Sequence, residues 1–177
     1  MKDFLKKFAI ALVALSAVAT YAQADVGCYV GVSASATVAS VKAEGVSISE
    51  NGLGAGVLGG CAIAIDKFDI GGRLAYDWSK DGGSAGSWQA VGVLGYRLND
   101  YVRPYALAGL AGIKIDLHDY KQSHSGMVAG AGFEISLSKN LALITEYNRL
   151  WANAKTFDDI RLDPGQHVVR IGVVSRF

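Results

Sequence analysis

Nine charged residues lie on one face of the predicted strands, where the other side chains are small or apolar. Five are positive and four are negative: Arg73, Arg97, Lys114, Arg170, Arg176, Asp77, Asp116, Glu134 and Glu146. If they face an enclosed interior, they must be paired, because an unpaired buried charge is too costly. If they face a water-filled lumen, they would line a path for ions. The near balance of charge is compatible with an enclosed interior and with a water-filled lumen. The choice between them depends on the strands that carry these residues.

Two further groups of side chains could do chemistry. Cys28 and Cys61 are the only cysteines. If Val38 lies opposite Asn51 in a hairpin, counting back along both strands places Cys28 opposite Cys61, so a disulfide is possible in an oxidising compartment. His118, Tyr120 and His124 lie within one loop and could bind haem or a metal, or could simply be solvated. We predict no cofactor and no metal site, and keep this loop as the candidate.

Two weaker motifs are set aside on their context. Residues 54–59 read Gly-Ala-Gly-Val-Leu-Gly, which matches a nucleotide-binding fingerprint. That fingerprint needs a helix after it, and no helix-forming stretch follows. Ser123 and Ser125 flank His124, but no carboxylate has the spacing of a hydrolytic triad. We therefore predict that the protein is not an enzyme.

The N-terminus has the features of an export signal. Lys2, Lys6 and Lys7 precede an apolar run over 8–18, and Ala22-Gln23-Ala24 supplies small residues for cleavage. We expect residues 1–24 to be a signal peptide and 25–177 to form one domain. Gly is abundant at 22 residues, Pro is scarce at 2, and the net charge is +1, which gives no case for nucleic-acid binding. The apolar content is high, yet no segment after the signal is long enough for a membrane-spanning helix.

Alternation with a period of two predicts eight strands, at about 27–38, 51–64, 68–78, 87–98, 103–117, 125–137, 140–151 and 166–177. Short turns are expected at Asp66-Lys67, Asn99-Asp100 and Lys139-Asn140, and longer loops near 39–50, 79–86, 118–124 and 152–165. Short turns that alternate with long loops are typical of an up-and-down transmembrane barrel. The predicted fold is therefore all-β, an eight-stranded antiparallel barrel in the bacterial outer membrane.

The faces of the strands follow from aromatic residues at their ends. Two girdles are predicted on the outer face, Tyr76, Trp78, Trp88, Tyr147 and Trp151 on the loop side and Phe68, Tyr96, Tyr105 and Phe177 on the turn side. In the fifth strand, Tyr105, Leu107, Gly109, Ala111, Ile113 and Ile115 are assigned to lipid, and Ala106, Ala108, Leu110, Gly112, Lys114 and Asp116 to the interior. An eight-stranded interior is just wide enough for side chains, so we interpret the nine charges as pairs that close the barrel.

The chain resembles the outer-membrane β-barrel family related to the transmembrane domain of outer-membrane protein A. It is more similar to the porin-family and immunogenic surface proteins of alphaproteobacteria, some of which bind haemin. The most specific match is the terminal signal of the last strand, carried by Arg170, Gly172 and Phe177, with Ser175 departing from the pattern. The resemblance implies recognition by the barrel-assembly machinery. It also implies contact with outer-membrane lipid and lipopolysaccharide.

The sequence therefore predicts a structural or surface-interaction protein of the outer membrane that contacts a host or surface ligand through its loops. The alternatives are a small-solute porin and a haem-binding or adhesion protein.

Overall fold

The structure is a computed structural model that describes residues 26–43, 46–79, 84–117, 120–152, 155–157 and 160–177. The segment predicted to be the export signal lies outside these residues. Side chains are described for residues 26–38, 51–78, 86–113, 125–151 and 166–177. In the described part of the chain, no helix has the length and hydropathy to cross a membrane.

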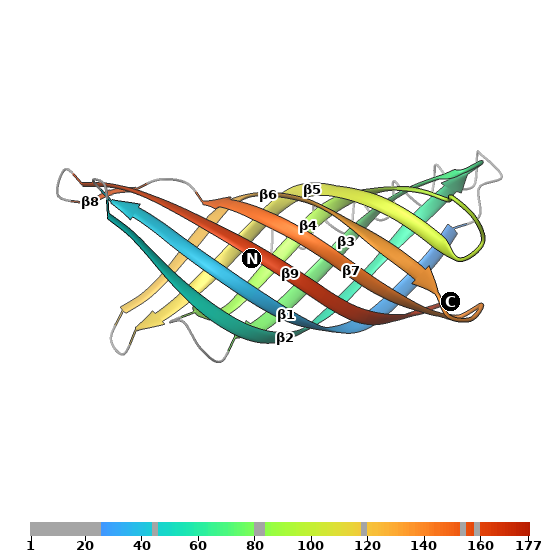
Figure 1. Ribbon diagram of the computed structural model, residues 1–177, viewed down its shortest axis with the longest axis horizontal. Coiled ribbons are helices and arrows are strands. Elements are labelled where there is room, and N and C mark those ends of the chain that lie inside the picture. Colours follow the sequence, from blue (N-terminus) through green and yellow to red (C-terminus); the bar gives the residue numbers. More distant parts are fainter. Residues whose placement is uncertain (1–25, 44–45, 80–83, 118–119, 153–154, 158–159) are drawn as a thin grey trace, which may run out of the picture.

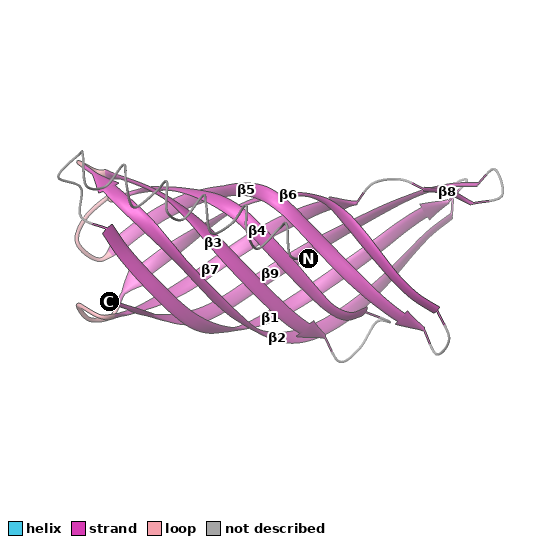
Figure 2. Ribbon diagram, turned by 180° about the vertical axis from the view of Figure 1, so that it is seen from behind, coloured by secondary structure: helices cyan, strands magenta, loops and turns pink. Residues whose placement is uncertain are grey.

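Eight strands close into a barrel, as predicted. They are β1 (Val26–Ala43), β2 (Val46–Ile65), β3 (Phe68–Ser79), β4 (Ser84–Tyr96), β5 (Val102–Leu117), β6 (Tyr120–Ser136), β7 (Leu141–Ala152) and β9 (Ile160–Arg176). Each pairs antiparallel with the next along the chain, and β9 pairs with both β7 and β1. The strands run diagonally around the long axis of the tube (Figures 1 and 2). Closure leaves no unpaired edge, which a sheet in lipid requires.

β1 and β9 pair with each other over most of their length, and this pairing, the seam, closes the barrel. It runs from Tyr29 opposite Arg176 to Lys42 opposite Asp163. One residue further along the seam, the backbone N–H of Phe177 donates to the carbonyl of Cys28 at 3.0 Å, and the N–H of Cys28 donates to the carbonyl of Phe177 at 3.2 Å.

The two ends of the barrel differ. At one end the strands are joined by short turns at 66–67, 97–101 and 137–140, as predicted, and Asp66 takes a positive φ of 54° in the tightest of them. At the other end the predicted long loops are largely strand, which corrects the expected boundaries. β1 and β2 stay paired as far as Ala43 and Val46, and β5 and β6 as far as Leu117 and Tyr120. A further short strand, β8 (Lys155–Phe157), pairs with the start of β9.

These extensions were missed because their composition is polar. Ser, Gly and charged residues are ordinary in loops, but a hairpin surrounded by water can carry them on both faces and still keep its backbone hydrogen bonds. Transmembrane strands need only about 9–11 residues, whereas β2 has 20 and β9 has 17. The surplus projects beyond the part that spans the bilayer.

The outer surface is apolar, and charged and polar side chains lie in the interior beside apolar ones, which inverts the pattern of a soluble protein. Exposed residues include Val32, Leu53, Leu94, Met127 and Ile171, each more than half exposed. The buried polar set comprises Ser33, Ser35, Asp69, Arg73, Asp77, Gln89, Glu134, Glu146, Asn148, Gln166 and Arg170. This inverted pattern is what a strand between lipid and a filled lumen produces.

The faces of β5 are opposite to those predicted. Tyr105, Leu107 and Ala111 are buried, at 6%, 3% and 2% exposure, whereas Leu110 is 54% exposed. Tyr105 therefore does not belong to the outer girdle. The prediction gave the interior to the face of Lys114 and Asp116, but β5 is 16 residues long. Charges near its far end lie beyond the span that lipid constrains, so they do not determine which face is inward.

The other predicted girdle residues lie on or near the outer surface. Phe68 and Phe177 are exposed at the end with the short turns, and the rings of Phe68 and Tyr96 lie 5.1 Å apart. At the opposite end Trp78 and Trp151 are exposed. Two bands of aromatic rings on an apolar wall mark the two edges of a bilayer.

Candidate functional site

The ion pairs of this protein lie mainly inside the barrel, where they join strands that are far apart in the sequence. Glu146, near the middle of β7, is the centre of the largest group. Its carboxylate accepts hydrogen bonds from Arg73 Nη1 at 2.7 Å and Arg73 Nη2 at 3.1 Å. The Tyr105 hydroxyl donates to it at 2.8 Å and the Asn148 amide at 2.9 Å. The side chains of Arg73 and Glu146 are 2% and 0% exposed, so this pair is removed from water.

Arg170 on β9 lies opposite Glu146 in the register of β7 and β9 and extends this group to Asp77 on β3. Its guanidinium forms ion pairs with both Glu146 and Asp77, and Gln89 lies 3.5 Å away. The Arg170 side chain is completely buried. Two arginines and two carboxylates therefore form a neutral set, which we call the central network and define as Arg73, Asp77, Glu146 and Arg170. Its bonds link β3, β7 and β9 through the interior.

A second group lies at the end with the short turns. Asp69 accepts from Arg97 at 2.7 Å and from Arg103 at 3.0 Å. Arg103 also donates to Glu134 at 2.7 Å, and Arg176 pairs with Glu134. We call these five residues the mouth network. They line a cavity of about 780 Å³ that includes Tyr29, Lys67 and Phe177.

Apolar side chains fill the space beside these charges. One cluster consists of Val91, Tyr105, Leu107, Ala111, Val128 and Leu150. The other consists of Leu58, Ala75, Ala142, Ile144 and Val174, with Tyr29 packed against it. Tyr29 therefore points inward, as its parity indicates. The central network and the two clusters together occupy the interior of the barrel with buried side chains.

The structure places the nine predicted interior charges in three groups. Arg73, Asp77, Glu134, Glu146 and Arg170 are buried. Arg97 and Arg176 belong to the mouth network, where their side chains are 49% and 32% exposed. The side chains of Lys114 and Asp116 lie outside the described part of the chain. Arg97 pairs with Asp69, which is not one of the nine.

Three important residues were missing from the sequence-based set. Asp69 has the same parity as Arg73 and Asp77, so the alternation of β3 already contained the signal. Arg103 and Tyr105 were missed because β5 was assigned with its faces reversed. Their inward position could have been found by requiring that the interior contain enough large side chains to fill it.

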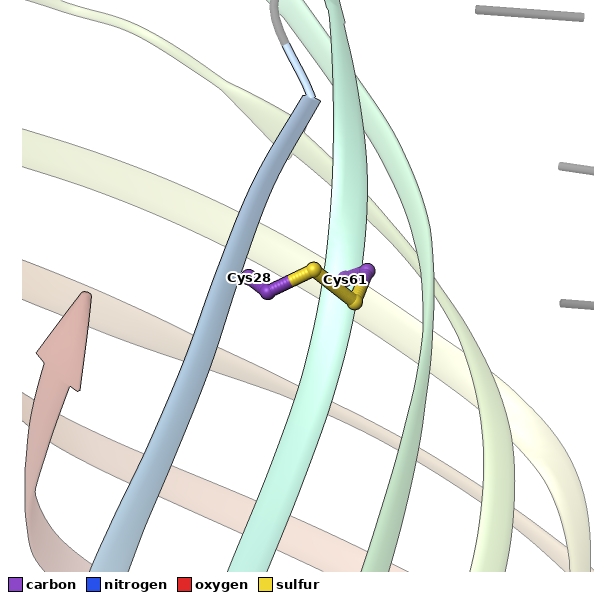
Figure 3. Close-up of a disulfide and its surroundings, with 2 residues drawn as sticks. All are labelled: Cys28 and Cys61. Atoms are coloured by element: carbon purple, nitrogen blue, oxygen red, sulfur yellow. A yellow bond between two sulfur atoms is a disulfide. The ribbon is translucent and has the colours of Figure 1, made fainter. Parts of the chain in front are cut away.

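The two cysteines form a disulfide between β1 and β2. Cys28 lies opposite Cys61 in the register that the hairpin predicts, with their Cα atoms 4.0 Å apart (Figure 3). Cys28 has the parity of Val30 and Val32, which are exposed on the outer wall. The bridge therefore lies on the outer face of the barrel, near the end with the short turns.

The haem or metal candidates are not tested by the structure. His118 and the side chains of Tyr120 and His124 lie outside the described residues. Among the described side chains, no three His, Cys, Asp or Glu residues come together as a group that could hold a metal ion. The three residues of the terminal signal occupy different places on β9 and just after it: Arg170 is interior, Gly172 is buried, and Phe177 is 77% exposed.

Comparison with known proteins agrees with this geometry. Residues 8–177 match the model of the outer membrane protein beta-barrel domain family. The chain belongs to this family. It is 32% identical over 149 residues to the 25 kDa outer-membrane immunogenic protein of Brucella abortus, covering 74% of this chain and 68% of that protein. The protein of the same name from Brucella ovis is 34% identical over 134 residues, covering 67% of this chain and 65% of that one.

Solved structures share the fold at low sequence identity. Ail, the attachment invasion locus protein of Yersinia pestis, superposes with a TM-score of 0.54 at 17% identity, over 84% of this chain and 98% of that one. Neisserial surface protein A gives 0.55 at 18% identity, over 85% and 97%. Family membership, the apolar outer wall and the closed strand order together place this protein in the bacterial outer membrane. It is an integral outer-membrane barrel whose interior contains buried charges.

Proposed function

We propose that this protein acts through its projecting hairpins on a ligand at the cell surface, and that it is neither an enzyme nor an open pore. The observation that carries the proposal is the central network, which fills the lumen with buried, mutually paired charges. A barrel closed in this way has no wide path for solutes. What it offers the outside is a rigid support for the strands that extend beyond the bilayer.

The orientation follows from the two unequal ends. In bacterial outer-membrane barrels the short turns face the periplasm and the longer connections face outward. We therefore place the short turns at 66–67, 97–101 and 137–140 in the periplasm. The extended hairpins β1–β2 and β5–β6, with β8 beside β9, then project from the cell.

The charges in the sequence of the long connections and the strand ends beside them indicate which class of ligand is favoured. Residues 39–50, 79–86, 114–124 and 152–165 carry six Lys or Arg and eight Asp or Glu. Ail was solved in complex with the heparin analogue sucrose octasulfate. A slightly acidic surface does not favour such a polyanion, since like charges repel. We propose a protein ligand on a host or neighbouring cell for this chain.

Both hairpins can be shortened beyond the part of their strands that spans the bilayer, although residues 39–42 also pair with β9 and residues 114–115 with β4. Val38 lies opposite Asn51, and Ile113 lies opposite His124. Replacing residues 39–50 or 114–123 by Asn-Gly would close each hairpin with a tight turn. We expect both variants to fold, as judged by heat-modifiable gel mobility, and at least one to lose adhesion of expressing cells to host cells. Adhesion at the wild-type level in both variants and in the variant lacking both hairpins would refute this proposal.

The small-solute pore remains the second candidate, because the cavity at the periplasmic mouth is large and lined with charge. Single-channel recording of the refolded barrel in planar bilayers distinguishes the two. We expect no sustained conductance from the wild-type protein. A stable open level in most recordings would favour the pore and would mean that the central network opens in the membrane.

Haem binding through His118, Tyr120 and His124 is a separate prediction from sequence. A haem titration followed by the Soret band, with the His118→Ala/His124→Ala variant as control, tests it. We expect the two proteins to give the same weak response. Saturable binding that the double substitution abolishes would establish a haem site in this hairpin.

A further inference from the structure

Among the described side chains, one charged residue lies on the outer wall where lipid is expected. Arg149 on β7 is exposed, and its neighbours Asn148 and Leu150 are buried, so it shares the outward face with Tyr147 and Trp151. Its guanidinium carbon lies 5.3 Å from the centre of the Trp151 ring. Within the described part of the chain it has no carboxylate partner. A cation held over an aromatic ring, with its donors free, is suited to bind an anion.

A second polar side chain lies directly across the strand pair. His167 on β9 is the register partner of Arg149. Its Nδ1 lies 2.5 Å from the hydroxyl of Tyr147, and the two rings are 5.9 Å apart. When the hydroxyl donates to Nδ1, the other ring nitrogen carries the proton and becomes a free donor. We call Tyr147, Arg149, Trp151 and His167 the outer cluster.

The position of the outer cluster along the barrel axis indicates which layer of the membrane it contacts. β7 begins at Leu141 beside the periplasmic turn, and Arg149 is its ninth residue. A tilted transmembrane strand crosses the hydrocarbon in about 9–11 residues. Arg149 therefore reaches the outer-leaflet boundary, the level marked by the exposed rings of Trp78 and Trp151. At this level a long cationic side chain can extend to the headgroups.

The flanks of the outer cluster are apolar. Val38 lies opposite His167, and Met127 lies opposite Trp151. Both are exposed, at 43% and 67%. A ligand that fits these surroundings has a phosphate for Arg149 and His167 and hydrocarbon chains for Val38 and Met127. We infer that the outer cluster binds the phosphate of a phosphorylated glycolipid of the outer leaflet, with its acyl chains along β1 and β6.

This inference rests on the proposed orientation, with the hairpins outward, but not on adhesion or on closure of the lumen. It is tested by direct binding. Refolded protein is placed in phosphatidylcholine nanodiscs that contain a lipopolysaccharide, its dephosphorylated form or phosphatidylglycerol, and bound lipid is counted by native mass spectrometry. The variants are Arg149→Gln and His167→Gln. Arg149→Lys serves as a second variant that keeps the charge but loses the planar fork.

Lys67 provides the matched control, because it is an exposed cation at the opposite end of the barrel. We expect Lys67→Gln to bind the phosphorylated glycolipid as the wild type does. Arg149→Gln should bind roughly tenfold more weakly or worse, and Arg149→Lys should fall between them. Heat-modifiable mobility verifies that each variant is folded.

Three results would overturn the inference. Undiminished binding by folded Arg149→Gln would show that the outer cluster is not the site. Equal binding of the dephosphorylated glycolipid or of phosphatidylglycerol would remove the assigned ligand. Full displacement by inorganic phosphate at millimolar concentration would show a site for the free anion and not for a lipid. None of these readouts depends on adhesion or conductance, so this inference and the proposed function can fail separately.

Discussion

At the scale of single residues, Glu146 has the most demanding position in the molecule. It is buried between Arg73 and Arg170 and is the only described carboxylate that contacts both of them. Replacing it with Ala would leave two guanidinium groups inside the barrel with one remaining carboxylate, Asp77. Removing one partner of a buried pair costs about 3–5 kcal/mol. We expect Glu146→Ala to lower the urea midpoint of the refolded barrel by a correspondingly large amount.

Thr145→Ala is the matched control, since it changes the adjacent residue on the other face of β7. A double substitution, Arg73→Met/Glu146→Leu, removes both members of this bidentate pair and should recover part of the loss. If Glu146→Ala unfolds at the same urea concentration as the wild type and conducts no better, water must solvate the network, and the account of a dry, closed interior is wrong.

At the scale of elements, β5 shows where alternation alone fails. The other five strands whose faces were assigned from the sequence, from 68–78 to 166–177, have the predicted faces, because their aromatic and small residues separate cleanly. In β5 both faces carry leucine and alanine, and the deciding charges at 114 and 116 lie toward its far end. Side-chain packing determines which face of β5 points inward. The buried face contributes Tyr105 and Leu107 to the interior cluster with Val91 and Val128.

This reversal can be tested with one residue type on two faces. Leu107 is 3% exposed and Leu110 is 54% exposed. Leu107→Ala leaves a cavity in the interior cluster, at a cost of about 2–5 kcal/mol. Leu110→Ala leaves space that acyl chains can fill, so its effect should be much smaller. Urea unfolding in the same vesicles compares them. A larger loss for Leu110→Ala would restore the original assignment of β5.

The disulfide acts at the same scale, because it joins β1 to β2 beside the closing seam. Cys28 is bridged to Cys61 and its backbone is bonded to Phe177. A bridge of this kind typically contributes about 2–4 kcal/mol. We expect Cys28→Ser/Cys61→Ser to unfold at lower urea under non-reducing conditions. A thiol reductant should shift the wild type to the same midpoint and leave the variant unchanged. If the wild type and the variant have equal urea midpoints without reductant, strand pairing alone stabilises this part of the barrel.

At the scale of the whole molecule, the sequence predicted the strand number, the closed fold and the compartment, since all three follow from alternation and aromatic bands. It did not predict the length of the hairpins, whose polar residues resemble loops. Nor did it predict most of the ion-pair partners. Arg97 binds Asp69, and Arg103 joins Asp69 to Glu134, contacts between residues 28 to 34 positions apart. Such partners depend on the stagger of the strands around the barrel, which a local sequence pattern does not specify.

Closure of the barrel between β1 and β9 can be tested at the terminal residue. Phe177 makes two backbone hydrogen bonds with Cys28 and extends an exposed aromatic ring from the outer wall at the periplasmic end. Deleting it removes both bonds and the ring, so β1 and β9 lose their last point of contact on the periplasmic side. We propose that the barrel-assembly machinery also recognises this ring. Folded barrel in the outer-membrane fraction, measured by heat-modifiable mobility, should fall several-fold on deletion, whereas Phe177→Tyr should retain it. Wild-type levels after deletion would show that the seam closes and assembles without its terminal aromatic residue.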